Sequence, residues 1–115
     1  MLDSIKSLAR QYAADIVQTR RHLHAHPELS FQERNTARFV ADQLKAIGIT
    51  PQEGVADTGL VALIEGTKGS SGSARVVGLR ADMDALPIHE ANDVPYKSTI
   101  DGVMHACGHD MHTAS

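Results

Sequence analysis

The aliphatic run at residues 60–64, LVALI, constrains the fold more than any other part of this sequence. Five apolar residues without polar alternation are typical of a short strand that is buried on both faces. A second β-branched stretch at residues 75–81 follows a Gly- and Ser-rich segment at residues 66–73, which is interpreted as a surface loop. We therefore expect strands at residues 60–65 and 75–81, joined closely enough to pair antiparallel.

Two amphipathic helices precede these strands and could cover them. Apolar residues recur at helical steps from Leu2 to Leu23, and the helix should end near Ala25 or His26, because Pro27 disfavours helical geometry before it. A second apolar stripe runs through residues 37–47. The sequence thus predicts two helices, followed by a β-hairpin and a site-bearing loop.

Local signals mark the ends of the second helix. Ser30 and Glu33 have the spacing of a capping box, and Gly48 can adopt the left-handed conformation that closes a helix. Residues 49–58, which contain Pro51 and Gly54, are expected to form a connection or a short edge strand.

Composition excludes several classes of protein. The formal charge of −3 gives no general attraction to nucleic acid or to an anionic membrane, so neither is an expected partner. The single cysteine allows no intramolecular disulfide and fits a reducing compartment. The longest aliphatic run is too short to span a bilayer, and charges throughout the first twenty residues leave no secretion core. These features predict a cytoplasmic protein of one domain.

The chemistry of the chain changes at residue 82. Residues 82–115 contain six of the fourteen acidic residues, four of the seven histidines and the only cysteine, but a single cationic side chain, Lys97. Such a segment combines a negative field with nitrogen, oxygen and sulfur donors, which favours a site for a divalent cation.

Cys107 and His109 are the sharpest candidates for metal ligands. They flank Gly108, and residues two apart in an extended backbone point to the same side, while glycine adds no crowding side chain. A thiolate and an imidazole suit zinc, although two ligands do not complete a site. The alternative is a buried free cysteine beside an exposed histidine. A cysteine nucleophile is disfavoured, because the acidic surroundings would raise the thiol pKa.

Asp82 and Asp84 directly follow the second predicted strand. Carboxylates at the carboxyl end of a strand lie where α/β folds place their ligands, so both could face a metal or a metal-bound histidine. The competing interpretation is a turn in which the two aspartates cap backbone amides. Pro87 supports a chain reversal under either interpretation.

The other histidines are expected to support the site rather than to form it. His105 and His112 are interpreted as packing or hydrogen-bonding residues, and Asp110 as the N-cap of a helix starting at Met111 or as an acceptor for an imidazole proton. The histidines at positions 22, 24 and 26 diverge on a helix and are interpreted as structural residues at the interhelical corner.

Three blocks carry a resemblance to a known family. They are RHLHAHPELSF at residues 21–31, LRADMDALPI at residues 79–88 and MHACGHDMHTA at residues 104–114. Their order and spacing resemble the start of the metal-dependent amidohydrolases, which include hippurate hydrolases, N-acyl-amino-acid amidohydrolases and auxin-conjugate hydrolases. The resemblance implies an α/β fold: the amino-terminal segment of a three-layer, zinc aminopeptidase-like catalytic domain.

The resemblance also implies roles for individual residues. Cys107 and His109 match metal ligands of a site that binds two divalent ions (zinc, manganese, cobalt or nickel), and Asp84 matches a position to which we assign a supporting catalytic role. The implied reaction is hydrolysis of the amide bond of an N-acyl amino acid, a small-molecule substrate, by a homo-oligomeric enzyme. The alternative is a non-enzymatic metal-binding or interaction module derived from such an enzyme.

Family members are much longer than residues 1–115. Their general base, remaining ligands and lid or dimerisation domain follow the Cys-Gly-His block, and no residue here matches the general base. We therefore expect the 115-residue chain alone to lack amidase activity and to self-associate through its uncovered strand.

Overall fold

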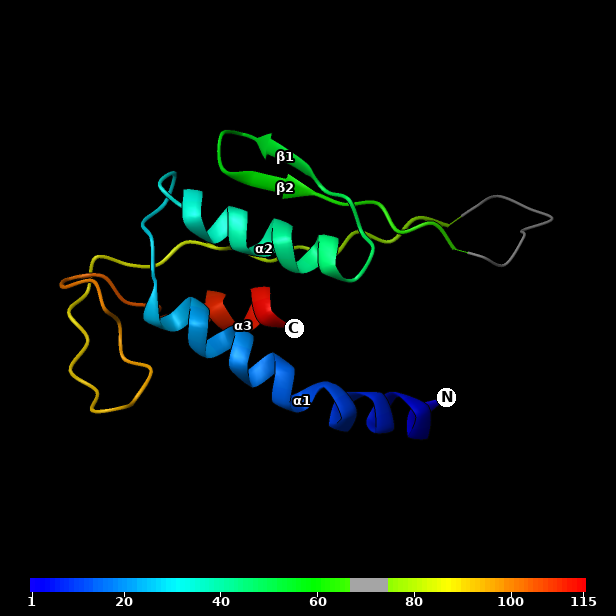
Figure 1. Cartoon of the computed structure of the whole chain (residues 1–115), viewed down its shortest axis with the longest axis horizontal. Helices are drawn as coiled ribbons and strands as arrows, with labels where there is room; N and C mark the ends of the chain where they lie inside the picture. The colour runs from blue at the N-terminus through cyan, green and yellow to red at the C-terminus, as the bar shows by residue number, and fades with distance from the viewer. Residues whose placement is uncertain (67–74) are drawn as a thin grey trace.

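The computed structural model describes residues 1–66 and 75–115, so the predicted Gly- and Ser-rich loop lies, except for Gly66, outside the described residues. In chain order the elements are α1 (Leu2–Ala25), α2 (Arg34–Ala46), β1 (Gln52–Val55), β2 (Gly59–Val61) and α3 (His109–Ala114). The short α3 packs against α1, while the β1–β2 hairpin lies beyond α2 (Figure 1). This arrangement confirms the α/β class.

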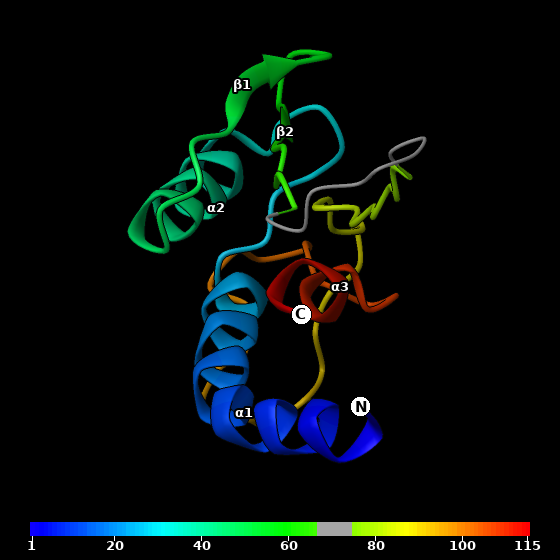
Figure 2. The ribbon, with the colours of Figure 1, turned by 90° about the vertical axis from the view of Figure 1, so that its right-hand side faces the viewer.

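The first helix ends where its sequence predicts. Ala25 is its last residue, and the N–H of His26 donates to the carbonyls of His22 and Leu23 ahead of Pro27. The amino-terminal end of α1 extends away from the other elements, as two perpendicular views show (Figures 1 and 2). Among the described residues, no helix combines the length and apolar character needed to cross a membrane.

The predicted capping box does not form at the start of α2. Helix α2 begins at Arg34, and Glu33 occupies the N-cap position without a side-chain capping bond. The carboxylate of Glu28 caps the helix instead. It accepts hydrogen bonds from the backbone N–H groups of Asn35 at 3.2 Å and Thr36 at 2.8 Å. The chain turns between Ser30 and the helix, with the N–H of Gln32 donating to the carbonyl of Leu29 at 2.9 Å and the N–H of Arg34 to that of Gln32 at 2.8 Å.

The β-hairpin forms from different residues than the sequence predicts. β1 pairs antiparallel with β2, and the structure assigns no strand to the described residues 62–66 and 75–81. A turn of three residues closes the observed pair, with positive φ at Ala56 and Asp57. Closing so short a loop costs less entropy than the predicted pairing across residues 66–73. Gly54, at φ +77°, accommodates the bulge in β1.

The described chain buries few large apolar side chains. Leu23, Ala41 and Ala85 are its buried apolar residues. By contrast, the apolar side chains at residues 61–64 and 76–79, here named the apolar stretches, are exposed. The most exposed of them are Leu63 (74%), Ile64 (75%), Val76 (86%), Val77 (81%) and Leu79 (97%). The expectation that residues 60–64 are buried on both faces is therefore wrong for this chain, because no element of the described residues covers them.

Candidate metal centre

Backbone pairing brings the three sequence blocks together. Ala85 forms a parallel bridge with Leu29, and Leu86 forms an antiparallel bridge with Met104. The N–H of Ala85 donates to the carbonyl of Glu28 at 2.8 Å, and Leu86 and Met104 exchange hydrogen bonds of 2.9 and 3.0 Å. The segment that follows Asp84 thus lies between the interhelical corner and the strand-like residues that precede Cys107.

Gly108 sets the direction in which the chain enters α3. It is the N-cap of α3 and has φ +91°, a conformation that side-chain-bearing residues rarely adopt. A Cβ atom built at Gly108 would meet nothing within 4 Å. The glycine is therefore required for its backbone conformation, and not, as its position between Cys107 and His109 suggested, to relieve crowding.

His109 is oriented by Asp84. Its Nδ1 lies 2.9 Å from the backbone oxygen of Asp84 and 2.9 Å from Oδ1 of the same residue. Because both oxygens accept, Nδ1 carries a proton, and in the neutral ring Nε2 then has the lone pair. Metal-ligating histidines commonly have this arrangement, with one ring nitrogen donating to a carboxylate or carbonyl and the other left for the ion. The geometry of His109 thus fits a divalent cation.

Cys107 supplies a free and exposed thiol two residues before His109. Within residues 1–66 and 75–115, no group of three or more His, Cys, Asp or Glu side chains is placed to hold one metal ion. A thiolate and an imidazole match the donor chemistry of zinc and related ions. These residues therefore fit part of a metal shell, and at least one further ligand is needed.

An ionic cluster joins α1 to this segment; three of its four side chains are buried and Arg20 is partly exposed. It consists of Arg20 and His24 on α1, Glu90 in the following loop and Asp110 in the first turn of α3. The ring of His24 joins the two acids: Nδ1 is 2.8 Å from Oδ2 of Asp110, and Nε2 is 3.0 Å from Oε1 of Glu90. Nε of Arg20 donates to the same oxygen of Asp110 at 2.8 Å. The cluster connects α1 to α3 at the residue after His109.

Both acids of the ionic cluster are held ionised. Burial opposes ionisation of Glu90, but the N–H of Ser98 and the imidazole of His24 outweigh it and lower the pKa of Glu90 to about 2. Burial also opposes ionisation of Asp110, whose pKa is nevertheless lowered by its hydrogen bond with His24 and by the charge of Arg20. Side chains of α1 thus stabilise the ionised form of these two acids in the segment after residue 82.

Asp110 has a different main role from the predicted helix cap. Its Oδ1 does accept the N–H of Met111 at 3.0 Å, but α3 begins two residues earlier than expected, at His109, and its N-cap is Gly108. The other carboxylate oxygen contacts His24 and Arg20. Asp110 therefore accepts an imidazole proton, but from His24, which is not one of the two candidate metal ligands.

The remaining histidines occupy distinct environments. His22 and His26 lie on one side of α1, with ring centroids 4.5 Å apart, and His22 stacks on Phe39 at 4.1 Å. His24 faces the ionic cluster instead, so the three do not form one site. His105 is buried, and neither ring nitrogen has a hydrogen-bond partner among the described residues; burial lowers its pKa.

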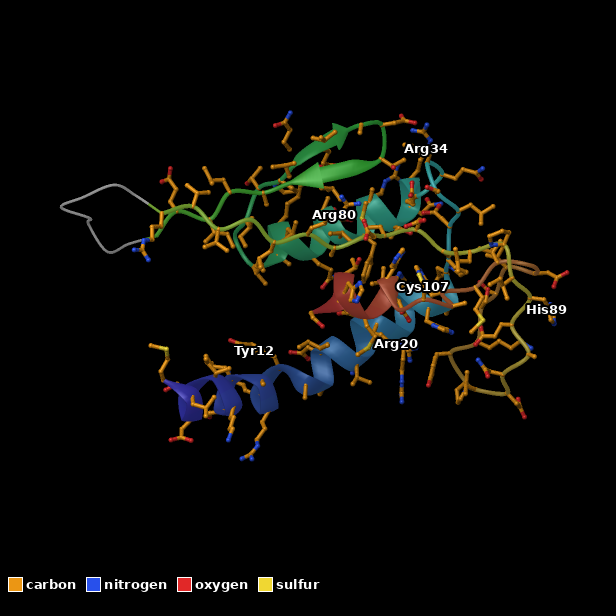
Figure 3. All side chains as sticks on the ribbon, turned by 180° about the vertical axis from the view of Figure 1, so that it is seen from behind. Tyr12, Arg20, Arg34, Arg80, His89 and Cys107 are labelled. Carbon is orange, nitrogen blue, oxygen red and sulfur yellow. The ribbon has the colours of Figure 1, made fainter. Side chains whose placement is uncertain are left out.

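Sequence reasoning missed the ionic cluster as a unit. Asp110 and His24 are 86 residues apart, and no local period links positions so distant. The available signal was the charge imbalance after residue 82, since buried acids need cationic partners and Lys97 alone could not provide them. Figure 3 shows Arg20 and Cys107 near the junction of α1 and α3, whereas His89 lies at the outer end of the loop.

Comparisons with known proteins agree with this arrangement. Residues 78–115 match the model of peptidase family M20/M25/M40. An N-acyl-L-amino acid amidohydrolase from Geobacillus stearothermophilus is 48% identical over 112 residues, covering 97% of this chain and 29% of that protein. Thermostable carboxypeptidase 1 from Saccharolobus solfataricus is 44% identical over 115 residues, covering 99% of this chain and 28% of that protein.

A solved structure shows the same backbone arrangement. The crystal structure of a dinuclear metal-binding M20 peptidase from Bacillus subtilis superposes with a TM-score of 0.82 at 42% identity, covering 91% of this chain and 28% of that one. The chain therefore spans little more than a quarter of the length of these relatives. The resemblance to the metal-dependent amidohydrolases is confirmed, and it concerns their amino-terminal part.

Proposed function

Proceeding from its similarity to the amino-terminal part of M20 hydrolases, we propose that this chain provides part of a two-metal centre for amide-bond hydrolysis. Residues 1–115 would form the amino-terminal segment of the catalytic domain, and an N-acyl amino acid would be the substrate. The observation that carries the proposal is the contact between Nδ1 of His109 and Asp84, which leaves Nε2 of His109 for an ion, two residues after the exposed thiol of Cys107.

The residues of the chain have separable tasks in this proposal. Cys107 as thiolate and His109 through Nε2 would hold a cation of the zinc, manganese, cobalt or nickel type. Asp84 keeps the proton on Nδ1 of His109 and fixes the plane of the ring. When bound, the ions would polarise the amide carbonyl and acidify water.

Cobalt(II) binding tests the ligand assignment. We expect wild-type chain to show thiolate-to-cobalt charge transfer on titration, and Cys107→Ser to abolish it. Asp84→Asn should weaken the binding about 10- to 100-fold, the usual effect of losing the partner of a ligand. Asp57→Asn is the matched control, because Asp57 forms only an exposed pair with Arg34. Tight binding that survives Cys107→Ser would refute the assignment.

A chimera tests the catalytic part of the proposal. The 112 residues of this chain that align with the Geobacillus enzyme, at 48% identity, would replace the matching segment of that enzyme. We expect the chimera to hydrolyse an N-acyl amino acid, and Cys107→Ser to abolish turnover. A folded chimera that binds metal but hydrolyses nothing would favour the non-enzymatic alternative.

A further inference from the structure

The ring of His24 is enclosed by charged partners. His24, Glu90 and Asp110 are 3%, 2% and 1% exposed, and each ring nitrogen of His24 faces one carboxylate oxygen, at 2.8 and 3.0 Å. An ionised carboxylate can only accept, so each ring nitrogen of His24 is placed to donate to one of the two acids. The guanidinium of Arg20 adds a further donor to Asp110.

Three further groups surround the ring of His24. From α1, a terminal nitrogen of Arg20 lies 3.4 Å from Nδ1; from the loop, the Tyr96 ring meets the imidazole edge-on at 5.7 Å; and the His105 ring lies 6.4 Å away. Removing one member of such a cluster would leave a buried charge unpaired, which is far less favourable than the complete set.

The position of Asp110 links this cluster to the candidate metal centre. Asp110 directly follows His109 in the first turn of α3, and Gly108 before them has φ +91°. One carboxylate oxygen is held by His24 and Arg20, while the other accepts the N–H of Met111. The start of α3 is therefore held from both sides of the turn, and the ring of His109 points to Asp84.

We propose that His24 is a positioning residue for His109, acting through Asp110 to fix the first turn of α3 and hence the single orientation in which His109 presents Nε2. The inference rests on the proposed function for its consequence, metal binding at Cys107 and His109. Its structural content, the orientation of His109, stands separately from that consequence. His24 touches no metal ligand itself.

The test compares His24→Gln with His89→Gln. The control removes a histidine that also pairs with a carboxylate, Asp101 at 2.9 Å, but in an exposed pair. In the metal-free chain, imidazole ¹H–¹⁵N spectra should show wild-type His109 protonated at Nδ1 alone. We expect His24→Gln to convert His109 to a mixture of tautomers and to weaken cobalt(II) binding about tenfold, the lower end of the effects found for outer partners of ligands. His89→Gln should match wild type in both measurements.

Each outcome decides one of the two claims. An unchanged His109 tautomer in folded His24→Gln, or equal effects of both variants, would overturn the inference. Absence of charge transfer in wild type would refute the proposed metal site, while the tautomer comparison would still decide the role of His24. If His24→Gln does not fold, Glu90→Gln replaces it, because Glu90 bonds to His24, Asn92 and Ser98 and not to α3. An unaltered His109 in that variant would likewise overturn the inference.

Discussion

The ionic cluster and the apolar stretches reverse the usual distribution of polar and apolar residues. His24, Glu90 and Asp110 are almost fully buried, whereas Val77 and Leu79 are 81% and 97% exposed. The charged residues are buried because each finds its partner within the described chain. The apolar residues are exposed because no described element covers them. Burial among the described residues therefore depends on whether a partner or a covering element is present, and not on whether the side chain is polar.

The largest expected effect distinguishes the two regions by stability. His24→Ala removes a hydrogen-bond partner from two buried carboxylates and should lower the free energy of unfolding by about 3–5 kcal/mol. Leu79→Ala removes an exposed side chain and should change it by less than about 0.5 kcal/mol. Urea denaturation followed by far-UV circular dichroism measures both. Equal losses in the two variants would invalidate the comparison.

Self-association is the next largest effect, and it concerns the apolar stretches. Exposed apolar side chains next to a two-stranded sheet favour pairing with a second copy. Ile64→Lys should shift the association midpoint about tenfold or more to higher concentration, since burying such a side chain contributes about 1.5–3 kcal/mol. Light scattering over a concentration series tests this. Ile47→Lys, at a residue 72% exposed outside these stretches, is the control and should leave the midpoint unchanged.

The pH dependence of stability tests whether Glu90 is held ionised within the ionic cluster. Since the pKa of Glu90 falls from its ordinary 4.5 to about 2 on folding, the unfolded chain binds more protons between these values. Stability from this group is complete above about pH 4.5 and is lost as the pH falls toward 2. In Glu90→Gln this component should be absent, so the stability of the variant should fall less steeply in that range. Parallel acid-unfolding profiles would contradict the assignment.

The smallest expected effect on stability concerns the cap at the start of α2. Glu28→Ala removes the acceptor of two backbone N–H groups at the start of α2 and should cost about 1 kcal/mol, as loss of a cap usually does. Ser30→Ala should cost almost nothing, because the capping box is not formed. Thermal denaturation of the two variants measures the difference. A larger loss in Ser30→Ala would restore the sequence-based prediction.

Local chemistry explains which features of the fold could be predicted. Pro27 correctly places the end of α1, and Gly48, with φ +84°, correctly marks the turn after α2. The hairpin was misplaced because β-branched content at residues 75–81 reports strand propensity and not the partner. The observed pairing depends on the short turn at Ala56 and Asp57. Both residues have positive φ, which the sequence did not indicate because neither is a glycine.

The candidate site also contains features that the sequence predicted and features that it did not. Motif spacing drew attention to Asp84, Cys107 and His109, and the structure brings Asp84 and His109 into contact. The sequence did not predict His24 as the partner of Asp110, because helical geometry only showed that neighbouring histidines diverge. Which of them faces the acids depends on tertiary packing, and packing over 86 residues leaves no periodic pattern.

Hydrogen exchange by mass spectrometry compares the protection of α1 beside the ionic cluster with that of the apolar stretches. It is measured at a concentration where light scattering shows a monomer. The account predicts slow exchange for amides of the last two turns of α1 and for those of Leu86 and Met104, which pair beside the candidate metal centre. It predicts exchange at nearly unprotected rates for residues 62–66 and 75–80. Equal protection of residues 75–80 and the end of α1 in the monomer would contradict it, because the apolar stretches would then be covered within one chain.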